Sequence, residues 1–557
     1  MLYFYSDEVY TEVMGELVSS RSSATETEAA RYSSTSHLLA LSLSLFLTAV
    51  ALVPRVLLAT RLDMVTDEIV YFRAGRLYFP LVTHLQFWST AWSYNYEHPP
   101  LVKLLIGAAL ALNNTIGHPL PDLLAARLPG LLSGTLLLPA IYLLGRRPFG
   151  AQAAFLAALS LALSPWLSYF SALAYLDMPM TTLITVAFLL IWHARARPGL
   201  YPVAAALAAL AFASKYTAIL AVPPMILYTL YHFCVLERRR PPLKYGLLAV
   251  GIGVLVFLLA DPAIWTNPPK RLYHSFLFEL QHAINGHDFF LAGHYMTHVP
   301  RWTVLYILLV KLSVFLTIPA GLFLLYGLFQ LVRFHLRPTM ELERASALAF
   351  GVCWLGGLLL TFCLLNIVVG THYHLPLAPA VALTGCAALV AVLKAGLARI
   401  PRPHPAYVLV PALLATCTSH LLGLLTVPAA EGYTSEPFQG ENTTLQVAYP
   451  GYRDAVLWLA QHTDKPARVG LVARDQTLDK KIDDLSWFAF NRDLPARFQL
   501  EEVTPDQPAE VYQRYDYLIW PAHLQQRNAP LPAPWAHHII YVFTGGQTTY
   551  CVIAARP

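Results

Sequence analysis

The sequence predicts a polytopic α-helical membrane protein with a small α/β domain at its C-terminal end. Of its 557 residues, 56% are hydrophobic and only 13% are charged, whereas a soluble domain carries roughly 25% charged residues. The charges fall in short runs between apolar stretches, as in a chain that crosses a bilayer repeatedly. The formal net charge is only +5 and no basic stripe follows a polar face, so nucleic acid is not expected as a partner.

Apolar stretches of membrane-spanning length follow one another through most of the chain. Each crossing needs about 20 apolar residues, and fewer where flanking side chains reach back to the interface. We expect about eleven spans, near residues 37–60, 123–145, 150–167, 178–195, 201–214, 216–235, 244–260, 313–334, 346–366, 375–394 and 406–427. The polar residues 1–36, rich in Ser, Thr and Glu, are predicted to be a disordered cytoplasmic tail.

Basic residues beside the spans determine the predicted orientation. Lys and Arg are enriched in cytoplasmic loops, and every basic cluster here falls in alternate loops. The N-terminus is therefore placed in the cytoplasm, and loops 61–122 and 261–312 and residues 431–557 on the outer side. The clusters are Arg146–Arg147, Arg195 with Arg197, Arg238–Arg240 with Lys244, Arg333 with Arg337 and Arg344, and Lys394 with Arg399 and Arg402.

The outer loops 61–122 and 261–312 are too long to be simple connectors. In the first, the apolar stretch 101–112 is too short to span comfortably, so we expect an amphipathic helix along the interface. The second is rich in His, Trp, Tyr and Pro, and is also expected to contain interfacial helix.

Residues 431–557 alternate polar and apolar segments, unlike the rest of the chain. GYRDAVLWLAQH has the pattern of a helix, and ARVGLVA, FQLEEV and YDYLIWP have that of strands. HHIIYVFTGGQTTYCVIAA predicts a hairpin that turns at Gly545–Gly546. These segments predict a small extracytoplasmic α/β domain.

Ionisable residues collect at the outer ends of the predicted helices, where they are costly and are functional candidates by default. A carboxylate there can act as general base on a hydroxyl acceptor. Lys, Arg and His can hold a phosphate and stabilise it as a leaving group. An acidic pair beside cations at a membrane surface fits a lipid-phosphate donor whose tail stays in the bilayer. The residues are Asp67, Glu68, Glu97, His98, Arg127, Asp177, Lys215, His372, Tyr373 and His374.

Six segments carry a family resemblance by their order between about residue 60 and 385. They are TDEIVYFRAGRLYF, EHPPLVKLLIGAALAL, RLPGLLSGTLLLPAIYLLGRR, SPWLSYFSALAYLDMP, ASKYTAIL and HYHLPLAPAVALTG. With them the chain resembles the dolichyl-phosphate-mannose protein mannosyltransferase family. It is also similar, more broadly, to bacterial membrane glycosyltransferases of the GT-C fold, including the aminoarabinose transferases of lipid A. The resemblance implies a GT-C transmembrane domain over residues 37–430.

The same resemblance implies an inverting transfer of a mannose-like sugar from a polyprenyl-phosphate carrier to a hydroxyl acceptor at the outer face. It implies that Asp67 is the base, with Glu68 as its partner and Asp177 as a further acid. His98, Lys103, Arg127, Lys215 and Tyr216 are expected to hold the donor phosphate and lipid, and Glu97, His372, Tyr373 and His374 the substrate. No metal ligands are assigned. Dependence on a divalent cation varies within the family, which leaves that cofactor open.

Several of these residues also have ordinary structural explanations. Asp177 could cap the helix that begins at Met178, a role compatible with function. Arg127 and Lys215 could be interfacial residues that extend toward water. One of two adjacent acids such as Asp67 and Glu68 is often only structural.

The sequence allows more than one acceptor and more than one class of protein. Loop 261–312 is too short for the β-trefoil domain of the eukaryotic protein mannosyltransferases, which favours a bacterial enzyme of the cell membrane. A protein Ser/Thr, a lipid and a glycan all remain possible acceptors. The alternative class is a transporter or flippase for polyprenyl-linked lipid or sugar, which predicts ionisable residues at mid-helix depth.

Overall fold

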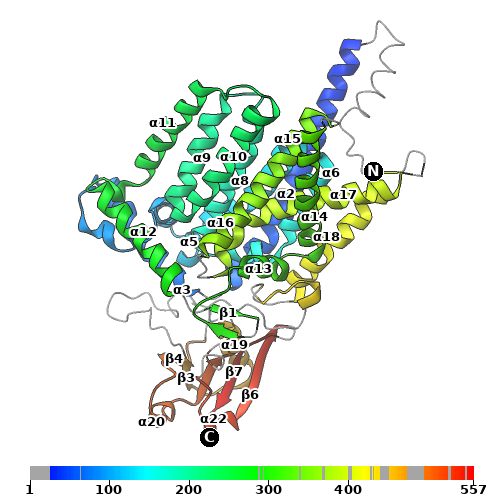
Figure 1. The fold of residues 1–557 in the computed structure, drawn as a ribbon. Coiled ribbons are helices and arrows are strands. Elements are labelled where there is room, and N and C mark those ends of the chain that lie inside the picture. The colour runs from blue at the N-terminus through cyan, green and yellow to red at the C-terminus, as the bar shows by residue number, and fades with distance from the viewer. Residues whose placement is uncertain are drawn as a thin grey trace.

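The structure is a computed structural model in which a large bundle of helices stands above a small sheet domain (Figure 1). The C-terminus lies in the sheet domain. The structure describes residues 25–557 except 63, 287–288, 293, 338–339, 367–369, 399, 401–403, 427–429, 431, 439–450, 473–494, 523, 525–528 and 546–547.

Within these residues, nine helices are long and apolar enough to cross a membrane. A tenth span is bent, and α9 (Leu200–Ser214) is shorter but packs along α8 and α11. Each of the predicted spans thus coincides with an apolar helix, and the polytopic α-helical membrane fold is confirmed. The nine are the apolar part of α2 (Thr25–Arg61), α5 (Asp122–Phe149), α8 (Asp177–Ala194), η2 (Tyr216–Ala221) with α10 (Val222–Leu230) and η3 (Tyr231–Leu236), α11 (Leu243–Ala260), α14 (Val314–Leu336), α15 (Leu342–Gly351) with η5 (Val352–Gly356) and α16 (Gly357–Leu365), η6 (Thr371–Leu377) with α17 (Ala378–Gly396), and α18 (Ala406–Thr426).

The bent span consists of α6 (Ala151–Leu163) and α7 (Pro165–Ser171), which meet at 63°. The prediction treated 150–167 as one straight helix, but Pro165 has no backbone N–H and disfavours a helical residue before it. The carbonyls freed at the end of α6 are satisfied by the buried Arg55 of α2, which donates to Ala162 O at 3.0 Å and Leu161 O at 3.5 Å.

The first helix also begins earlier than predicted. α2 starts at Thr25, so the tail predicted for residues 1–36 is shortened by 25–36, where Glu and Ala favour helix. Residues 1–24 of that tail lie outside the described chain.

Segment 61–122 is largely helical. It contains α3 (Thr66–Thr83), η1 (Thr90–Ser93) and α4 (Leu101–Thr115), of which α4 was predicted and α3 was not. The two helices pack closely through glycines: a Cβ on Gly107 would lie 2.3 Å from Gly75 O. A larger residue at Gly107 would therefore push α4 away from α3.

Segment 261–312 contains η4 (Pro262–Ile264), α12 (Pro268–Asn285), the strands β1 (Phe289–Leu291) and β2 (His294–Met296), and α13 (Thr303–Lys311). The helix expected here is α12, which is amphipathic. Its Ser275 and Glu279 are buried, whereas Tyr273, Leu280 and Ile284 are exposed. α12 thus directs a polar face toward the bundle and an apolar face outward.

The C-terminal segments form the predicted α/β domain. α19 (Tyr452–His462) packs on a five-stranded sheet of order β4-β3-β5-β7-β6. β3 pairs in parallel with β4 and β5, and β7 pairs antiparallel with β5 and β6. The β6–β7 hairpin closes at the pair Gly545–Thr548, while Gly546 lies outside the described residues. The strands are β3 (Ala467–Val472), β4 (Phe498–Val503), β5 (Tyr517–Pro521), β6 (Ile539–Gly545) and β7 (Thr548–Ala555), with the short helices η7 (Glu436–Phe438), α20 (Ala509–Tyr512) and α22 (Ala533–Ala536).

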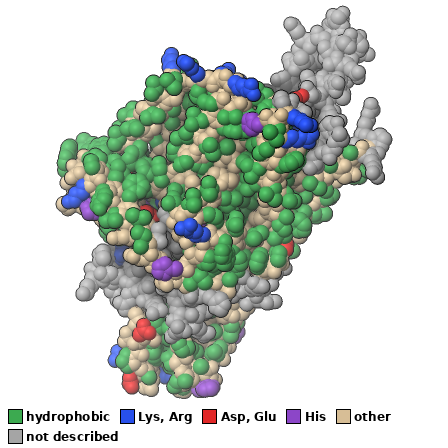
Figure 2. Space-filling model, in the orientation of Figure 1, with side chains coloured by type: hydrophobic (Ala, Val, Ile, Leu, Met, Phe, Trp, Pro, Cys, Tyr) green, Lys and Arg blue, Asp and Glu red, His purple; other side chains and the backbone are tan. Residues whose placement is uncertain are grey.

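The surface of the bundle is mostly hydrophobic (Figure 2). Several Lys and Arg side chains line its end opposite the sheet domain. Arg146 and Arg147 lie in the last turn of α5, and Arg333 in that of α14. This distribution agrees with the positive-inside pattern used to predict which end faces the cytoplasm.

Candidate active site

The predicted site residues come together at the end of the bundle nearest the sheet domain, around Tyr71 on α3. The Tyr71 ring lies 5.8 Å from that of Tyr175 and 6.1 Å from that of His98. Burial, then Asp67, Asp177, Tyr373 and Glu97, hold the pKa of the Tyr71 hydroxyl well above its usual value. Acids from distant parts of the chain therefore face one aromatic side chain.

Asp67 lies in the first turn of α3 and is partly buried. The end of a helix fixes its backbone, and the positive end of the helix dipole favours a carboxylate there. It is one turn before Tyr71, so both side chains lie on the same face of α3. Asp67 thus combines access to solvent with a rigid support.

Glu68, the adjacent acid, is fully buried and fully engaged. Arg127 donates Nε and Nη2 to its two oxygens at 2.8 and 2.7 Å. The backbone N–H groups of Ala174 and Val65 donate to it at 2.8 and 2.9 Å. Glu68 therefore ties the start of α3 to α5 and to the segment before α8.

Arg127 directs its guanidinium group into the protein. Besides Glu68, it donates Nη1 to Ala59 O at 2.8 Å and Leu62 O at 2.9 Å, and its side chain is 1% exposed. A guanidinium used in this way orients the loop after α2. This geometry favours a positioning role over the phosphate contact expected from the sequence.

Asp177 and Lys215 form a second buried ion pair, from the start of α8 and the end of α9. Lys215 Nζ lies 2.8 Å from Asp177 Oδ1 and 3.6 Å from the centre of the Tyr373 ring. Asp177 Oδ2 is buried and has no hydrogen-bond partner among the described residues. Asp177 lies in the first turn of α8, where Leu176 is the cap residue.

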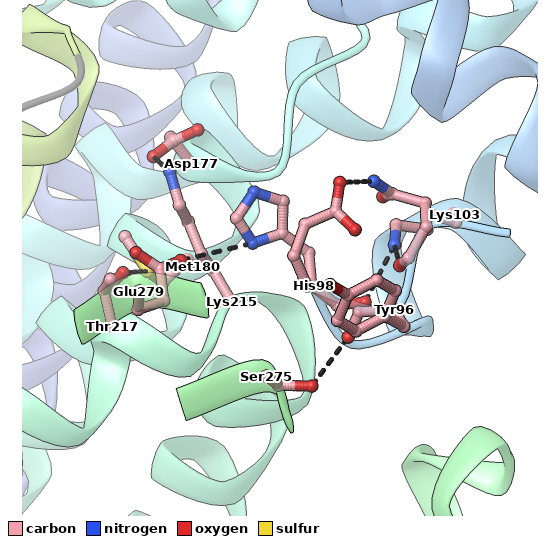
Figure 3. Close-up of polar contacts among 11 residues, drawn as sticks. Tyr96, His98, Lys103, Asp177, Met180, Lys215, Thr217, Ser275 and Glu279 are labelled. Atoms are coloured by element: carbon pink, nitrogen blue, oxygen red, sulfur yellow. Dashed lines mark hydrogen bonds and ion pairs between the residues drawn. The ribbon is translucent and has the colours of Figure 1, made fainter. Parts of the chain in front are cut away.

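His98 and Lys103 flank the Pro99–Pro100 turn before α4. Lys103 Nζ donates to Asn95 O at 2.7 Å and His98 O at 2.8 Å, which holds that turn in place. Burial lowers the pKa of Lys103 to about 7, while Glu97 and Asp261 act in the opposite sense. Figure 3 shows the His98 ring reaching toward Glu279 of α12, with Asp177 and Lys215 beyond it.

A pocket lies beside His98. Aromatic side chains and Arg271 of α12 line it, and Arg271 is only partly buried. Tyr216 donates at 2.8 Å to Asp261 Oδ2, so its hydroxyl is already engaged. The lining residues are Tyr78, Trp92, Tyr96, His98, Tyr216, Ala263, Ile264, Arg271 and Ser275.

The remaining predicted substrate residues are buried or paired. Glu97 accepts a hydrogen bond from Asn95. His372 packs its ring against Phe170 and Tyr175 at 5.5 and 5.6 Å. His372, Tyr373 and His374 lie in the tight helical turn η6, and all three are buried.

Four residues near this site were not selected from the sequence: Tyr71, Asp261, Arg271 and Glu279. Each lies in an outer segment that was predicted as loop or interfacial helix without assigned faces. The signal for Glu279 was its place on an amphipathic helix, on the face opposite Tyr273 and Leu280. In the described part of the chain, no three His, Cys, Asp or Glu side chains are grouped so that they could hold a metal ion.

The C-terminal domain reaches this site through its own core. Met64 and Ile69, on either side of Asp67 and Glu68, are buried in one apolar cluster with Val456 and Leu459 of α19. Leu123, one turn before Arg127, belongs to the same cluster. The domain therefore packs directly on the start of the helix that carries Asp67.

Comparisons with known proteins agree with the resemblance found in the sequence. The pattern of the dolichyl-phosphate-mannose-protein mannosyltransferase family matches residues 97–265. This segment runs from Glu97 through His98, Lys103, Arg127, Asp177 and Lys215 to the start of the second long outer segment. The comparison with curated protein sequences finds no match.

Among solved structures, the chain is similar to ArnT from Cupriavidus metallidurans bound to undecaprenyl phosphate. The identity is 17%, the TM-score is 0.47, and the match covers 92% of this chain and 98% of ArnT. It is also similar to the oligosaccharyltransferase of Archaeoglobus fulgidus in the apo form, with 12% identity, a TM-score of 0.48, and coverage of 88% and 70%.

Proposed function

We propose that the protein is an inverting glycosyltransferase that takes a sugar from a polyprenyl-phosphate carrier. The observation that carries this proposal is the convergence of Asp67, the Asp177–Lys215 pair and His98 at one end of a membrane-embedded bundle. A carboxylate can act as the base and a cationic side chain can stabilise a departing phosphate, so both suit a donor with a lipid-phosphate leaving group. The matching family is defined by the donor dolichyl-phosphate-mannose, which supports a mannose-like sugar.

In the proposed reaction, Asp67 removes the proton from an acceptor hydroxyl. The oxygen attacks the anomeric carbon from the face opposite the phosphate, and the carbon–oxygen bond to the phosphate breaks. The lipid phosphate leaves with the bonding electron pair, and Asp67 then releases its proton to water. Inversion follows from the single displacement.

The leaving phosphate is assigned to the pocket beside His98. Arg271 lines that pocket and His98 stands at its edge, so both can face an anion. Lys215 is paired with Asp177 and does not line this pocket. Lys103 fixes the turn that carries His98, and we assign it a positioning role.

The acceptor is a hydroxyl of a protein, lipid or glycan, reached from the extracytoplasmic side of a cell membrane. Basic residues at the opposite end of the bundle support this orientation. A transporter or flippase is the alternative. It is less well supported because the ionisable residues named above lie at helix ends rather than at mid-helix depth.

The test is transfer by the purified protein in liposomes. Radiolabelled polyprenyl-phosphate sugars are supplied singly as donors, with membrane extracts as acceptors, and the label is followed into product. We expect label in a product that is stable to mild acid, which cleaves the sugar–phosphate donor. Movement of labelled donor between leaflets without any such product would favour the flippase instead.

The packing of the C-terminal domain on α3 yields a further prediction. Ile69→Ala removes buried carbon atoms between α3 and the C-terminal domain, which should lower the free energy of unfolding by about 2–5 kcal/mol. We expect slower transfer with little change in donor KM, because Asp67 loses its rigid support. Leu81→Ala is the matched control, since Leu81 is buried on the same helix in a separate cluster with Tyr78 and Trp92. An equal loss from both variants would contradict a role for the domain contact.

A further inference from the structure

Glu279 stands out among the buried acids because of what surrounds it. It lies on the inward face of α12, and its side chain is 7% exposed. Oε1 is 3.5 Å from His98 Nδ1, yet neither carboxylate oxygen has a hydrogen-bond partner among the described residues. A buried carboxylate without donors is costly, so this arrangement indicates a missing ligand that supplies them.

A second buried oxygen lacks a donor in the same region. Asp177 Oδ2 has no hydrogen-bond partner in the described chain, while Oδ1 is held by Lys215. Asp177 and Lys215 both act electrostatically on Glu279, which places the three groups close together. The region thus offers several hydrogen-bond acceptors and requires a ligand with several O–H or N–H donors.

Glu279 lies between the two halves of the proposed reaction site. On one side is His98, which borders the pocket with Arg271, two helical turns before Glu279 on α12. On the other side is Asp177, whose charge, like that of Asp67, raises the pKa of Tyr71. Glu279 is therefore a neighbour of His98 at the pocket and is influenced by the Asp177–Lys215 pair.

We propose that Glu279 is a sugar-binding residue that accepts hydrogen bonds from hydroxyl groups of the transferred sugar, with Asp177 Oδ2 as its neighbour in the same subsite. This proposal rests on the function proposed above and adds the residue that recognises the sugar. Burial raises the pKa of Glu279 to about 7, so a neutral carboxyl is accessible near neutral pH and costs less to bury. A bound hydroxyl provides the donor that the protein does not.

The test compares lipids that differ only in the presence or identity of the sugar. Binding of sugar-free polyprenyl phosphate and of polyprenyl-phosphate sugars (mannose, glucose, galactose, N-acetylglucosamine and aminoarabinose) is measured by titration of the purified full-length protein. The wild type is expected to bind at least one sugar lipid more tightly than the sugar-free lipid. In Glu279→Gln this preference should fall by about tenfold, while affinity for the sugar-free lipid changes less than twofold.

Controls separate this role from a structural one. Gln281→Ala alters an exposed position on α12 and should leave both affinities unchanged. Glu279→Asp keeps a carboxyl group, and should lose part of the preference and retain the melting temperature. Equal weakening of both lipids in Glu279→Gln, or no change in either, would overturn the proposal even if the wild type transfers sugar. A wild type with no preference for any sugar lipid would overturn it as well. Transfer activity decides the proposed function separately, because this assay measures binding alone.

Discussion

Asp67→Asn is expected to reduce sugar transfer by about a hundredfold or more, since a positioned general base typically contributes 10²–10⁴. Asn has nearly the same shape and cannot take up the acceptor proton. The donor does not contact this group before the reaction, so its KM should change little. The measurement is the initial rate of radiolabelled transfer in liposomes with saturating donor.

Two further variants make that result specific. Asp67→Glu keeps a base but shifts it by one methylene, and should retain a measurable rate. Asp122→Asn is the matched control: Asp122 also lies in the first turn of a helix, but it is partly exposed and pairs with His118 at 3.5 Å. Transfer by Asp67→Asn at the wild-type rate would remove Asp67 from the mechanism.

Loss of the Glu68–Arg127 pair is expected to destabilise the protein strongly. Removing one partner of a buried ion pair costs about 3–5 kcal/mol, because the other charge is left in a low-dielectric interior. Arg127→Met would leave Glu68 with a buried charge and would release Ala59 O and Leu62 O as well. We expect a clear drop in melting temperature in detergent, and a fall in kcat larger than any rise in donor KM.

The ion pair Arg195–Glu343 provides the comparison, because its carboxylate side is exposed while the Arg195 side chain is 15% exposed. The Glu343 side chain is 67% exposed, and exposed ion pairs contribute about 0–1 kcal/mol. Glu343→Gln should therefore leave the melting temperature almost unchanged. A large rise in donor KM for Arg127→Met, with normal stability, would restore the phosphate-binding role expected from the sequence.

The sequence was sufficient for features that depend on local composition. Apolar length predicted the spans, because a bilayer crossing needs a fixed run of hydrophobic residues. Alternation of polar and apolar residues predicted β3, β4, β5 and the β6–β7 hairpin. Span 150–167 was predicted as one straight helix although it contains Pro165. The bend is stabilised by hydrogen bonds from Arg55, which lies more than 100 residues away in the chain.

The helix α3 was missed for a different reason. Asp67 and Glu68 are expected as catalytic residues, but two acids in this position also indicate the first turn of a helix. The Glu68 side chain accepts the Val65 N–H, which is the local interaction that begins the helix. A helical interpretation of TDEIVYFRAGRLYF would have placed Tyr71 on the face of Asp67.

By itself, the sequence determined a membrane-spanning helical chain, the helix ends where its acids and bases gather, and the segments that match a glycosyltransferase family. Only the tertiary structure decided which of those charged residues form ion pairs with one another. Glu68 with Arg127 and Asp177 with Lys215 form buried pairs, Asp67 keeps access to solvent, and Glu279 joins them from α12. The reason is physical: a charge in a low-dielectric interior must be matched by whatever group the fold brings near it, and spacing along the chain does not contain that information.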